Sequence, residues 1–227
     1  MNRLLGSLRI CLPEHLFVKD PESSDLGQRI IEQSINLIDT LGFEAFTFKK
    51  LGVEIASSES TIYRYFENKH KLLLYLTSWY WAWLEYKVVF ATANIENGEE
   101  RLRNMIATIC ESVKQDDNFS HINEEKLQRI VIAESSKAFL TKQVDRENRL
   151  GYFSSYKSLS ERMTTIIQEV KPQFKYAHSL VSVLLEGSHH QKFLRDHLPG
   201  LTNVSQDDRS VQLFFETMTF SMLNHGR

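Results

Sequence analysis

Residues 47–66 read Thr-Phe-Lys-Lys-Leu-Gly-Val-Glu-Ile-Ala-Ser-Ser-Glu-Ser-Thr-Ile-Tyr-Arg-Tyr-Phe and decide the fold of this chain. Thr47 is a favourable N-cap for a short helix that ends near Ile55. The Ala-Ser-Ser sequence at 56–58 offers no apolar continuation, and serine prefers to cap a new helix rather than lie inside one, so a tight turn is expected there. A second short helix is expected from about Ser58 to Tyr65.

Apolar residues recur at helical spacing on both sides of this stretch. Residues 26–41 form a long helical pattern, with Ser24 and Asp25 as candidate caps and Gly42 as a stop. The chain has only nine glycines and four prolines, and strand-like alternation is almost absent beyond residue 25. The sequence therefore predicts an all-α fold. Further helices are expected at about 68–90, 98–113, 123–138, 152–170, 173–196 and 205–223, with 139–150 unassigned.

Composition narrows the class of protein. The net charge is −2, so any surface that binds nucleic acid must be local. The two cysteines, Cys11 and Cys110, are far apart and show no metal-binding spacing, which favours a reducing cytoplasm. No stretch reaches the roughly 20 apolar residues needed to cross a bilayer, and residues 1–12 lack the features of a signal peptide. We therefore expect a soluble, cytoplasmic protein without a membrane partner.

Two short helices joined by a tight turn form a helix-turn-helix, whose second helix enters the major groove of DNA. The run Thr-Ile-Tyr-Arg-Tyr-Phe at 61–66, followed by Glu-Asn-Lys-His-Lys-Leu-Leu at 67–73, resembles the recognition-helix segment of the TetR family (TetR/AcrR-like) of transcriptional regulators. The resemblance covers about residues 26–76. It implies a homodimeric repressor of operator DNA whose helical body binds a small-molecule effector.

On this basis we expect three parts in the chain. Residues 1–25 form an N-terminal arm, 26–67 a three-helix DNA-binding head with the helix-turn-helix, and 68–227 a larger helical body for ligand binding and dimerisation. In the arm, apolar and polar residues alternate on either side of Pro13, which predicts a short hairpin or an extended segment.

By that resemblance, Tyr63 and Lys69 correspond to phosphate-contacting residues of the family and Thr47 to its backbone-contacting cap. Hydroxyl and ammonium groups near helix N-termini also suit phosphate contacts. Base readout falls to Glu59, Ser60 and Arg64, because Arg can bond guanine bidentately and Glu can accept from cytosine. An ion pair with Glu67, or a phosphate contact, is the alternative for Arg64. The full expected DNA-binding set is Thr47, Lys49, Ser58, Glu59, Ser60, Thr61, Tyr63, Arg64 and Lys69.

The turn departs from the pattern of the family. Where the family has a small residue and then a glycine, followed by a β-branched or aliphatic residue, this chain has Gly52, Ala56 and Ser57. Ala56 must avoid a positive φ or tolerate strain. Glu59 stands where a basic or small residue is common, which weakens nonspecific attraction to DNA. An ordinary helical hairpin packed on a helical core is the structural alternative for this segment.

The expected helix after residue 68 is rich in aromatic side chains. An aromatic stripe at helical spacing is usually core. By the resemblance, it also suits a small apolar or aromatic effector. The candidate pocket residues are Trp79, Trp83, Tyr86 and Phe90.

The last two expected helices carry more apolar residues than the core of one small helical body needs. Gly187-Ser188 permits the close approach of another helix. We therefore expect a twofold homodimer, because helix-turn-helix dimers need two heads about 34 Å apart, or a multiple of that distance. The expected interface residues are Leu180, Leu184, Gly187, Phe214 and Met218.

No catalytic residue, metal site or cofactor is expected. Glu186-x-x-His189 places a carboxylate and an imidazole on one helix face, but a di-iron bundle needs a second such motif. Ser154-x-x-Lys157 matches a serine-nucleophile motif whose companion motifs are missing. Two rival classes remain: a helical ligand-binding protein of TetR-like shape that has lost specific DNA binding, and an enzyme in a helical bundle.

Overall fold

The computed structural model describes residues 10, 12–113, 115 and 121–225, and among these there is no strand. The predicted all-α class is therefore confirmed, and the unassigned stretch contains a helix, α8. In chain order the elements are η1 (Glu14–Leu16), η2 (Pro21–Ser23), α2 (Asp25–Leu41), α3 (Phe48–Glu54), α4 (Glu59–Tyr63), α5 (Lys69–Thr92), α6 (Gly98–Cys110), α7 (Glu124–Phe139), α8 (Val144–Arg149), α9 (Ser154–Val170), α10 (Ala177–His197), η3 (Pro199–Leu201) and α11 (Asp208–His225).

The chain forms two compact units. Unit 1 comprises residues 1–81 and 113–155, and unit 2 comprises residues 82–112 and 156–227. This division differs from the one expected at residue 67, because the first part of α5 belongs with the helix-turn-helix, together with α7 and α8. The helix-turn-helix is thus part of a larger unit assembled from two separate stretches of the chain.

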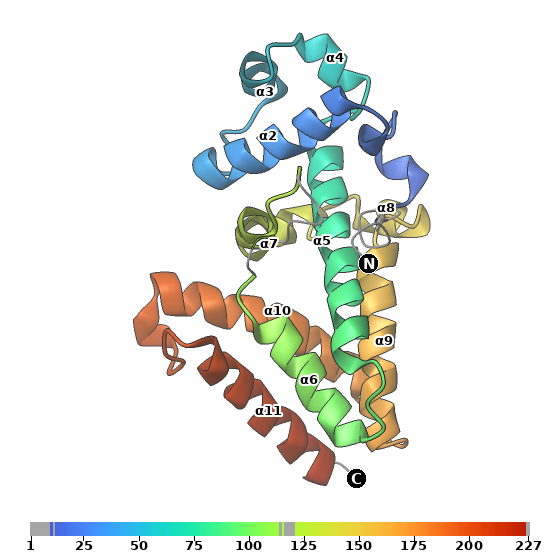
Figure 1. Cartoon of the computed structure of the whole chain (residues 1–227), viewed down its shortest axis with the longest axis vertical. Coiled ribbons are helices and arrows are strands. Elements are labelled where there is room, and N and C mark those ends of the chain that lie inside the picture. The colour runs from blue at the N-terminus through green and yellow to red at the C-terminus, as the bar shows by residue number, and fades with distance from the viewer. Residues whose placement is uncertain (1–9, 11, 114, 116–120, 226–227) are drawn as a thin grey trace. The chain divides into compact units, whose positions relative to one another are not determined.

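In unit 1, α2 is the helix on which α3 packs, and Figure 1 shows α3 and α4 close to it. Its isoleucines Ile30, Ile31 and Ile35 are fully buried, as the helical spacing predicts. The Ser24 hydroxyl caps the helix by accepting from the Gly27 amide at 3.3 Å. Gly42 ends it with φ of 77°, a conformation that L side chains rarely adopt.

The N-terminal arm is not a hairpin in its described part. Leu16 donates its amide to Pro13 O at 3.1 Å in the 3-10 helix η1, and its side chain is fully buried. The Val18 amide donates to Tyr65 O at 2.8 Å, so the arm joins the end of the recognition helix. Of the two predicted alternatives, the hairpin does not form in the described part of the arm, where two 3-10 turns alternate with extended backbone at Phe17 and Ser24. Residues 1–9 and 11 lie outside the described residues.

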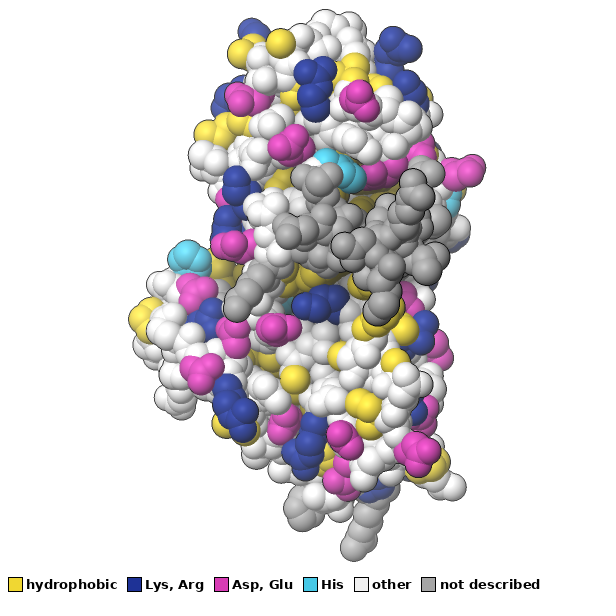
Figure 2. Space-filling model, viewed as in Figure 1, with side chains coloured by type: hydrophobic (Ala, Val, Ile, Leu, Met, Phe, Trp, Pro, Cys, Tyr) yellow, Lys and Arg dark blue, Asp and Glu magenta, His cyan; other side chains and the backbone are white. Residues whose placement is uncertain are grey.

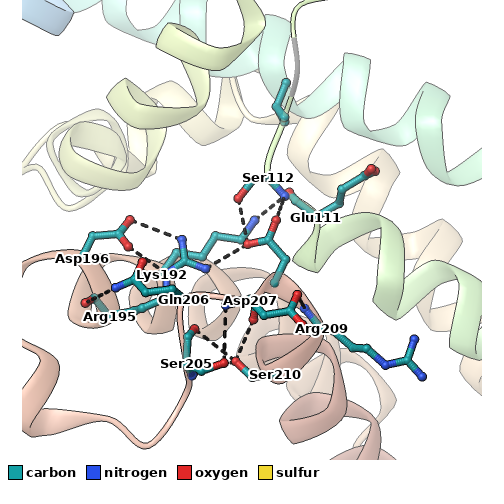
Figure 3. A network of polar contacts seen from close by, with 12 residues as sticks. Glu111, Ser112, Lys192, Arg195, Asp196, Ser205, Gln206, Asp207, Arg209 and Ser210 are labelled. Atoms are coloured by element: carbon teal, nitrogen blue, oxygen red, sulfur yellow. Dashed lines mark hydrogen bonds and ion pairs between the residues drawn. The ribbon is translucent and has the colours of Figure 1, made fainter.

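In unit 2, α6, α10 and α11 pack against one another. A polar network joins the end of α6 to α10 and to the start of α11 (Figure 3). The Asp208 carboxylate accepts from the Ser112 amide at 2.6 Å and from Arg195 Nη1 at 2.9 Å, and Lys192 Nζ donates to Glu111 O at 2.8 Å. Burial lowers the pKa of Lys192 to about 8. The network therefore fixes three helices through groups that are costly to bury unpaired.

The turn between α3 and α4 closes over Gly52. A Cβ at Gly52 would lie 2.8 Å from the Ser57 carbonyl oxygen, so no side chain fits there. The Ser57 amide donates to Gly52 O at 2.8 Å. Ala56 has φ of 50°, in the left-handed region, which costs a residue with a Cβ roughly 1–2 kcal/mol. Of the two outcomes expected for Ala56, the chain adopts the strained one.

We predict that Ala56→Gly raises the free energy of unfolding by up to about 1 kcal/mol, because relief of strain exceeds the added entropy of the unfolded chain. Ala133→Gly is the matched control. Ala133 is exposed within α7, where glycine should lower stability by about 1 kcal/mol. Urea unfolding followed by circular dichroism measures both changes. Equal losses of stability in the two variants would show that the Ala56 backbone carries no strain.

Candidate nucleic-acid interface

The helix-turn-helix presents two capped helix N-termini. The Thr47 hydroxyl accepts from the Lys50 amide at 3.2 Å at the start of α3. The Ser58 hydroxyl accepts from the Thr61 amide at 3.3 Å at the start of α4, and it lies 2.8 Å from the hydroxyls of both Ser60 and Thr61. Thr47, Ser58 and Ser60 are exposed. Each N-terminus therefore offers hydroxyl groups and a partial positive charge to an anion.

Helix α4 has one buried and one open face. Ile62 is fully buried, whereas Glu59, Ser60 and Arg64 are exposed. The sequence reasoning predicted these three residues for base readout, and the fold leaves their side chains exposed to solvent. No ion pair joins Arg64 to Glu67 among the contacts of the described residues. The open face carries one cation, one anion and one hydroxyl.

Tyr63 is braced at the edge of this face. Its ring packs edge-on against Phe48 of α3, with the ring centroids 5.1 Å apart. Its hydroxyl donates to Glu59 Oε1 at 3.4 Å, and 48% of the side chain remains exposed. The phenol is thus held in place by the neighbouring helix while its hydroxyl can still reach a phosphate.

Lys69 has a contact set that the sequence did not reveal. Its ammonium donates to the backbone carbonyls of Phe43 at 3.1 Å, Glu44 at 3.2 Å and Phe46 at 3.4 Å. It also lies 4.7 Å from the centroid of the Phe43 ring. Lys69 therefore holds the turn between α2 and α3, in addition to standing at the start of α5.

Other cations near the helix-turn-helix differ in their freedom. Lys50 Nζ donates to Ala45 O at 2.7 Å. Lys49 is exposed in the first turn of α3, with no ion pair among the described residues. On the face that Figure 2 shows, basic and acidic side chains are interspersed rather than gathered into one basic patch. This agrees with the net charge of −2, so attraction to DNA rests on a few local groups.

Tyr65 connects the end of the recognition helix to the arm and to α2. Its hydroxyl lies 2.9 Å from Ser24 Oγ and 3.3 Å from Lys19 Nζ. The hydrogen bond with Ser24, followed by Lys19, lowers the pKa of Tyr65. Sequence reasoning missed this link because Ser24 and Tyr65 are 41 residues apart.

The residues predicted to bind the effector differ in exposure and belong to different units. Trp79 is 2% exposed and belongs to unit 1, and Trp83 is 1% exposed at the start of unit 2. Tyr86 and Phe90 have ring centroids 4.5 Å apart, and Phe90 is 61% exposed. A cavity of about 390 Å³ in unit 2 has a different lining: Ala91, Asn104, Ala107, Thr108, Cys110, Glu111, Asp208, Arg209 and Gln212.

The predicted dimer residues divide into inner and outer positions. Leu180 and Leu184 are buried within the protomer, so their side chains add no surface for a partner. A Cβ on Gly187 would lie 2.9 Å from Phe215 Cζ, so this glycine serves the packing of α10 on α11. Phe214 is 47% exposed and Met218 is half-buried.

The Glu186-x-x-His189 pair is engaged within unit 2. Glu186 Oε1 accepts from the Tyr156 hydroxyl at 3.0 Å. Burial lowers the pKa of His189 to about 3, which keeps its imidazole neutral. Over the described ranges, no three His, Cys, Asp or Glu side chains are grouped closely enough to hold a metal ion. In the same part of the chain, no helix has the length and apolar character to cross a membrane.

Comparison with known proteins agrees with this geometry. The family model described as "Bacterial regulatory proteins, tetR family" matches residues 30–76, which include α3 and α4. No curated protein sequence matches the chain.

Several solved structures have a similar fold. A tetR-family regulatory protein from Rhodococcus RHA1 has a TM-score of 0.62 and 13% identity, covering 88% of this chain and 97% of its own. AibR in complex with isovaleryl coenzyme A and operator DNA has a TM-score of 0.56 and 14% identity, covering 84% and 97%. The superantigen PfiT has a TM-score of 0.59 and 13% identity, covering 91% and 100%. At these identities the likeness concerns the fold. Residues 30–76, with the helix-turn-helix at their centre, thus match the tetR family of bacterial regulatory proteins, within a chain that has the helical fold of the solved tetR-family regulator from Rhodococcus RHA1.

Proposed function

We propose that this protein is a transcriptional repressor that binds operator DNA sequence-specifically through α3 and α4. The observation that carries the proposal is the open face of α4, where Glu59, Ser60 and Arg64 are exposed beside two capped helix N-termini. This face matches what direct readout requires, with donors and acceptors on a helix that can enter the major groove.

The roles on this surface follow from its chemistry. Thr47, Ser58 and Tyr63 offer hydroxyls to phosphates on either side of the groove, and Lys49 adds an exposed ammonium. Arg64 suits a guanine because its guanidinium can donate to O6 and N7 together. The side chains that hold phosphates set the affinity, and Arg64 sets the sequence preference.

The rival class is a helical protein with this fold but without specific DNA binding. The superantigen PfiT has a similar fold, and its name does not mention DNA, so the fold alone does not establish DNA binding. The tetR-family match covers the helix-turn-helix itself, and this supports DNA binding over the rival. An enzyme is disfavoured by the same match.

We predict that Arg64→Ala relaxes the consensus at one base pair per half-site, at a cost of roughly 1–3 kcal/mol. Lys49→Ala should weaken all sequences alike and lower the salt slope of log K by roughly one per half-site. Selection of duplexes from random-sequence DNA by wild type and by Arg64→Ala measures the consensus, and anisotropy titrations at several salt concentrations measure the affinity of Lys49→Ala.

The control for this experiment is Arg209→Ala, which removes an exposed arginine at the start of α11, in unit 2. It should leave consensus and affinity unchanged. An unchanged consensus with Arg64→Ala would demote Arg64 to a phosphate contact. If the wild type selects no sequence at all, the chain belongs to the rival class.

For the effector, we propose a small apolar or aromatic molecule that binds in unit 2 beside the later part of α5. The exposed Phe90 ring, tilted against the ring of Tyr86, supports this because ligand sites are lined mostly by apolar and aromatic side chains. Lys87 Nζ lies 5.3 Å from the centroid of the Trp83 ring and donates to Glu111 Oε2 at 3.4 Å. The AibR complex with isovaleryl coenzyme A supports an effector that carries a short acyl chain.

We predict that anilinonaphthalene sulfonate and isovaleryl coenzyme A, used as two probes, bind wild type and lose affinity in Phe90→Ala. Tyr176→Ala is the matched control, because Tyr176 is also 61% exposed in unit 2. A probe that acts as an effector should change operator affinity by about 1–3 kcal/mol, and DNA should change probe affinity by the same factor. Equal probe binding by both variants would place the effector site elsewhere.

We further propose a homodimer through the outer faces of α10 and α11. These faces expose a set of apolar side chains, Val183, Leu213, Phe214 and Met222, each between 39% and 49% exposed. Buried Leu180 and Leu184 support the helices from within. Apolar side chains exposed on two packed helices fit a twofold interface that pairs them with their symmetry mates.

We predict that Phe214→Glu yields a folded monomer, because dimerisation would bury an unpaired charge. Leu140→Glu is the matched control, since Leu140 is 76% exposed in unit 1 and should leave the dimer intact. Leu184→Glu should instead unfold the protein, because its site lies inside the protomer. Light scattering with circular dichroism separates these outcomes, and a monomeric wild type at micromolar concentration would refute the dimer.

A further inference from the structure

The turn that leads into the helix-turn-helix is held by side chains from two distant helices. It spans residues 42–46, between the end of α2 and the N-cap of α3. Gly42 enters it with φ of 77°, and the rings of Phe43 and Phe46 are buried. Because Thr47 follows at once, the path of this turn sets the direction in which α3 starts.

Helix α7 supplies the acceptor for one end of this turn. Glu134 Oε1 accepts from the Phe43 amide at 3.1 Å, in a bond that spans 91 residues of sequence. Glu134 is only 9% exposed, and its other oxygen lies 2.7 Å from Lys137 Nζ, which also reaches Glu44 at 3.1 Å. A buried amide without this acceptor would have no local replacement, because the helical bonds of α2 have already ended.

Helix α5 supplies the donor for the rest of the turn, through the contacts of Lys69 with the carbonyls of Phe43, Glu44 and Phe46. Glu134 thus accepts a hydrogen bond from an amide of this short segment, and Lys69 donates to carbonyls of the same segment. The two side chains together satisfy one amide and three carbonyls, which leaves the turn little freedom to change its path.

Helix α7 is itself tied to α2 by other polar contacts. Arg129 binds the Asp39 carboxylate through two nitrogens, each at 2.9 Å, and Lys126 Nζ lies 2.7 Å from Asn36 Oδ1. The bidentate geometry fixes the relative position of the two helices. Glu134 therefore acts from a helix whose place beside α2 is set independently of the turn.

We propose that Glu134 is a positioning residue for DNA binding. Its bond to the Phe43 amide, together with the hydrogen bonds of Lys69 to the neighbouring carbonyls, fixes the orientation of α3 and α4 toward the duplex. The inference rests on the proposed DNA-binding function. It assigns to α7 a role in recognition without any contact with DNA. A movement of α7 would loosen the turn and reduce specific binding before it unfolds the helices.

The test compares Glu134→Ala, which removes the acceptor, with Glu134→Gln, whose amide oxygen can still accept from Phe43. Ser136→Ala is the matched control, because Ser136 is an exposed polar residue on the same helix. Three quantities are measured for each protein: hydrogen exchange of the amides of residues 43–47, affinity for the duplex that wild type selects, and affinity for random duplex at several salt concentrations.

For Glu134→Ala we expect exchange at the Phe43 amide to rise about tenfold and the ratio of selected to random affinity to fall about tenfold, the size typical of one lost buried hydrogen bond. The salt slope should stay unchanged, because no phosphate contact is lost. Glu134→Gln should restore the ratio to within about threefold of wild type, and Ser136→Ala should match wild type.

Faster exchange with an unchanged affinity ratio would overturn the positioning role while leaving the proposed function intact. Equal defects in the Ala and Gln variants would also overturn it, because the carboxylate charge rather than the bond to Phe43 would then matter. A wild type that selects no sequence would instead refute the proposed function. The exchange data would separately show whether Glu134 holds the turn.

Discussion

The helix-turn-helix depends on one close backbone contact, the approach of the Ser57 carbonyl oxygen to the Cα of Gly52. Any side chain at Gly52 would meet that oxygen at 2.8 Å, so the turn can close only over glycine. Closing it so tightly forces Ala56 into the left-handed region. The contact brings α3 and α4 together, and Ile62 of α4 is fully buried.

Electrostatics around the helix-turn-helix are sparse, and this raises the importance of geometry. Two lysines near the helix-turn-helix bind the protein itself: Lys50 donates to the Ala45 carbonyl, and Lys69, which the resemblance assigned to a phosphate, donates to three carbonyls. Fewer free charges mean a weaker nonspecific attraction to DNA. The proposed sequence-specific binding of DNA would then depend on the orientation of a small set of side chains. The hydrogen bonds that fix the turn before α3 are important for that orientation.

The DNA-binding head is also not an independent module of local sequence. The acceptor for Phe43 comes from α7, and the bonds to Tyr65 come from the arm and from the start of α2. Unit 1 accordingly joins residues 1–81 with 113–155. Residues 82–112, which lie between these two stretches in the sequence, belong to unit 2, in which we propose that effector and partner bind.

Most of the helices could be predicted from the sequence, because helix formation depends on caps, stops and apolar spacing that are all local. The predicted starts at Thr47, Ser58 and Asn68 agree with the hydrogen bonds that these side chains accept. The spacing could not assign α8, which is six residues long and mostly charged, nor the 3-10 turns of the arm. Only the tertiary structure decided that Leu184 is internal while Phe214 is exposed, and that Lys69 and Glu134 meet at one turn. A helical period places a side chain on a face, whereas its partner is set by packing between segments that can be 91 residues apart.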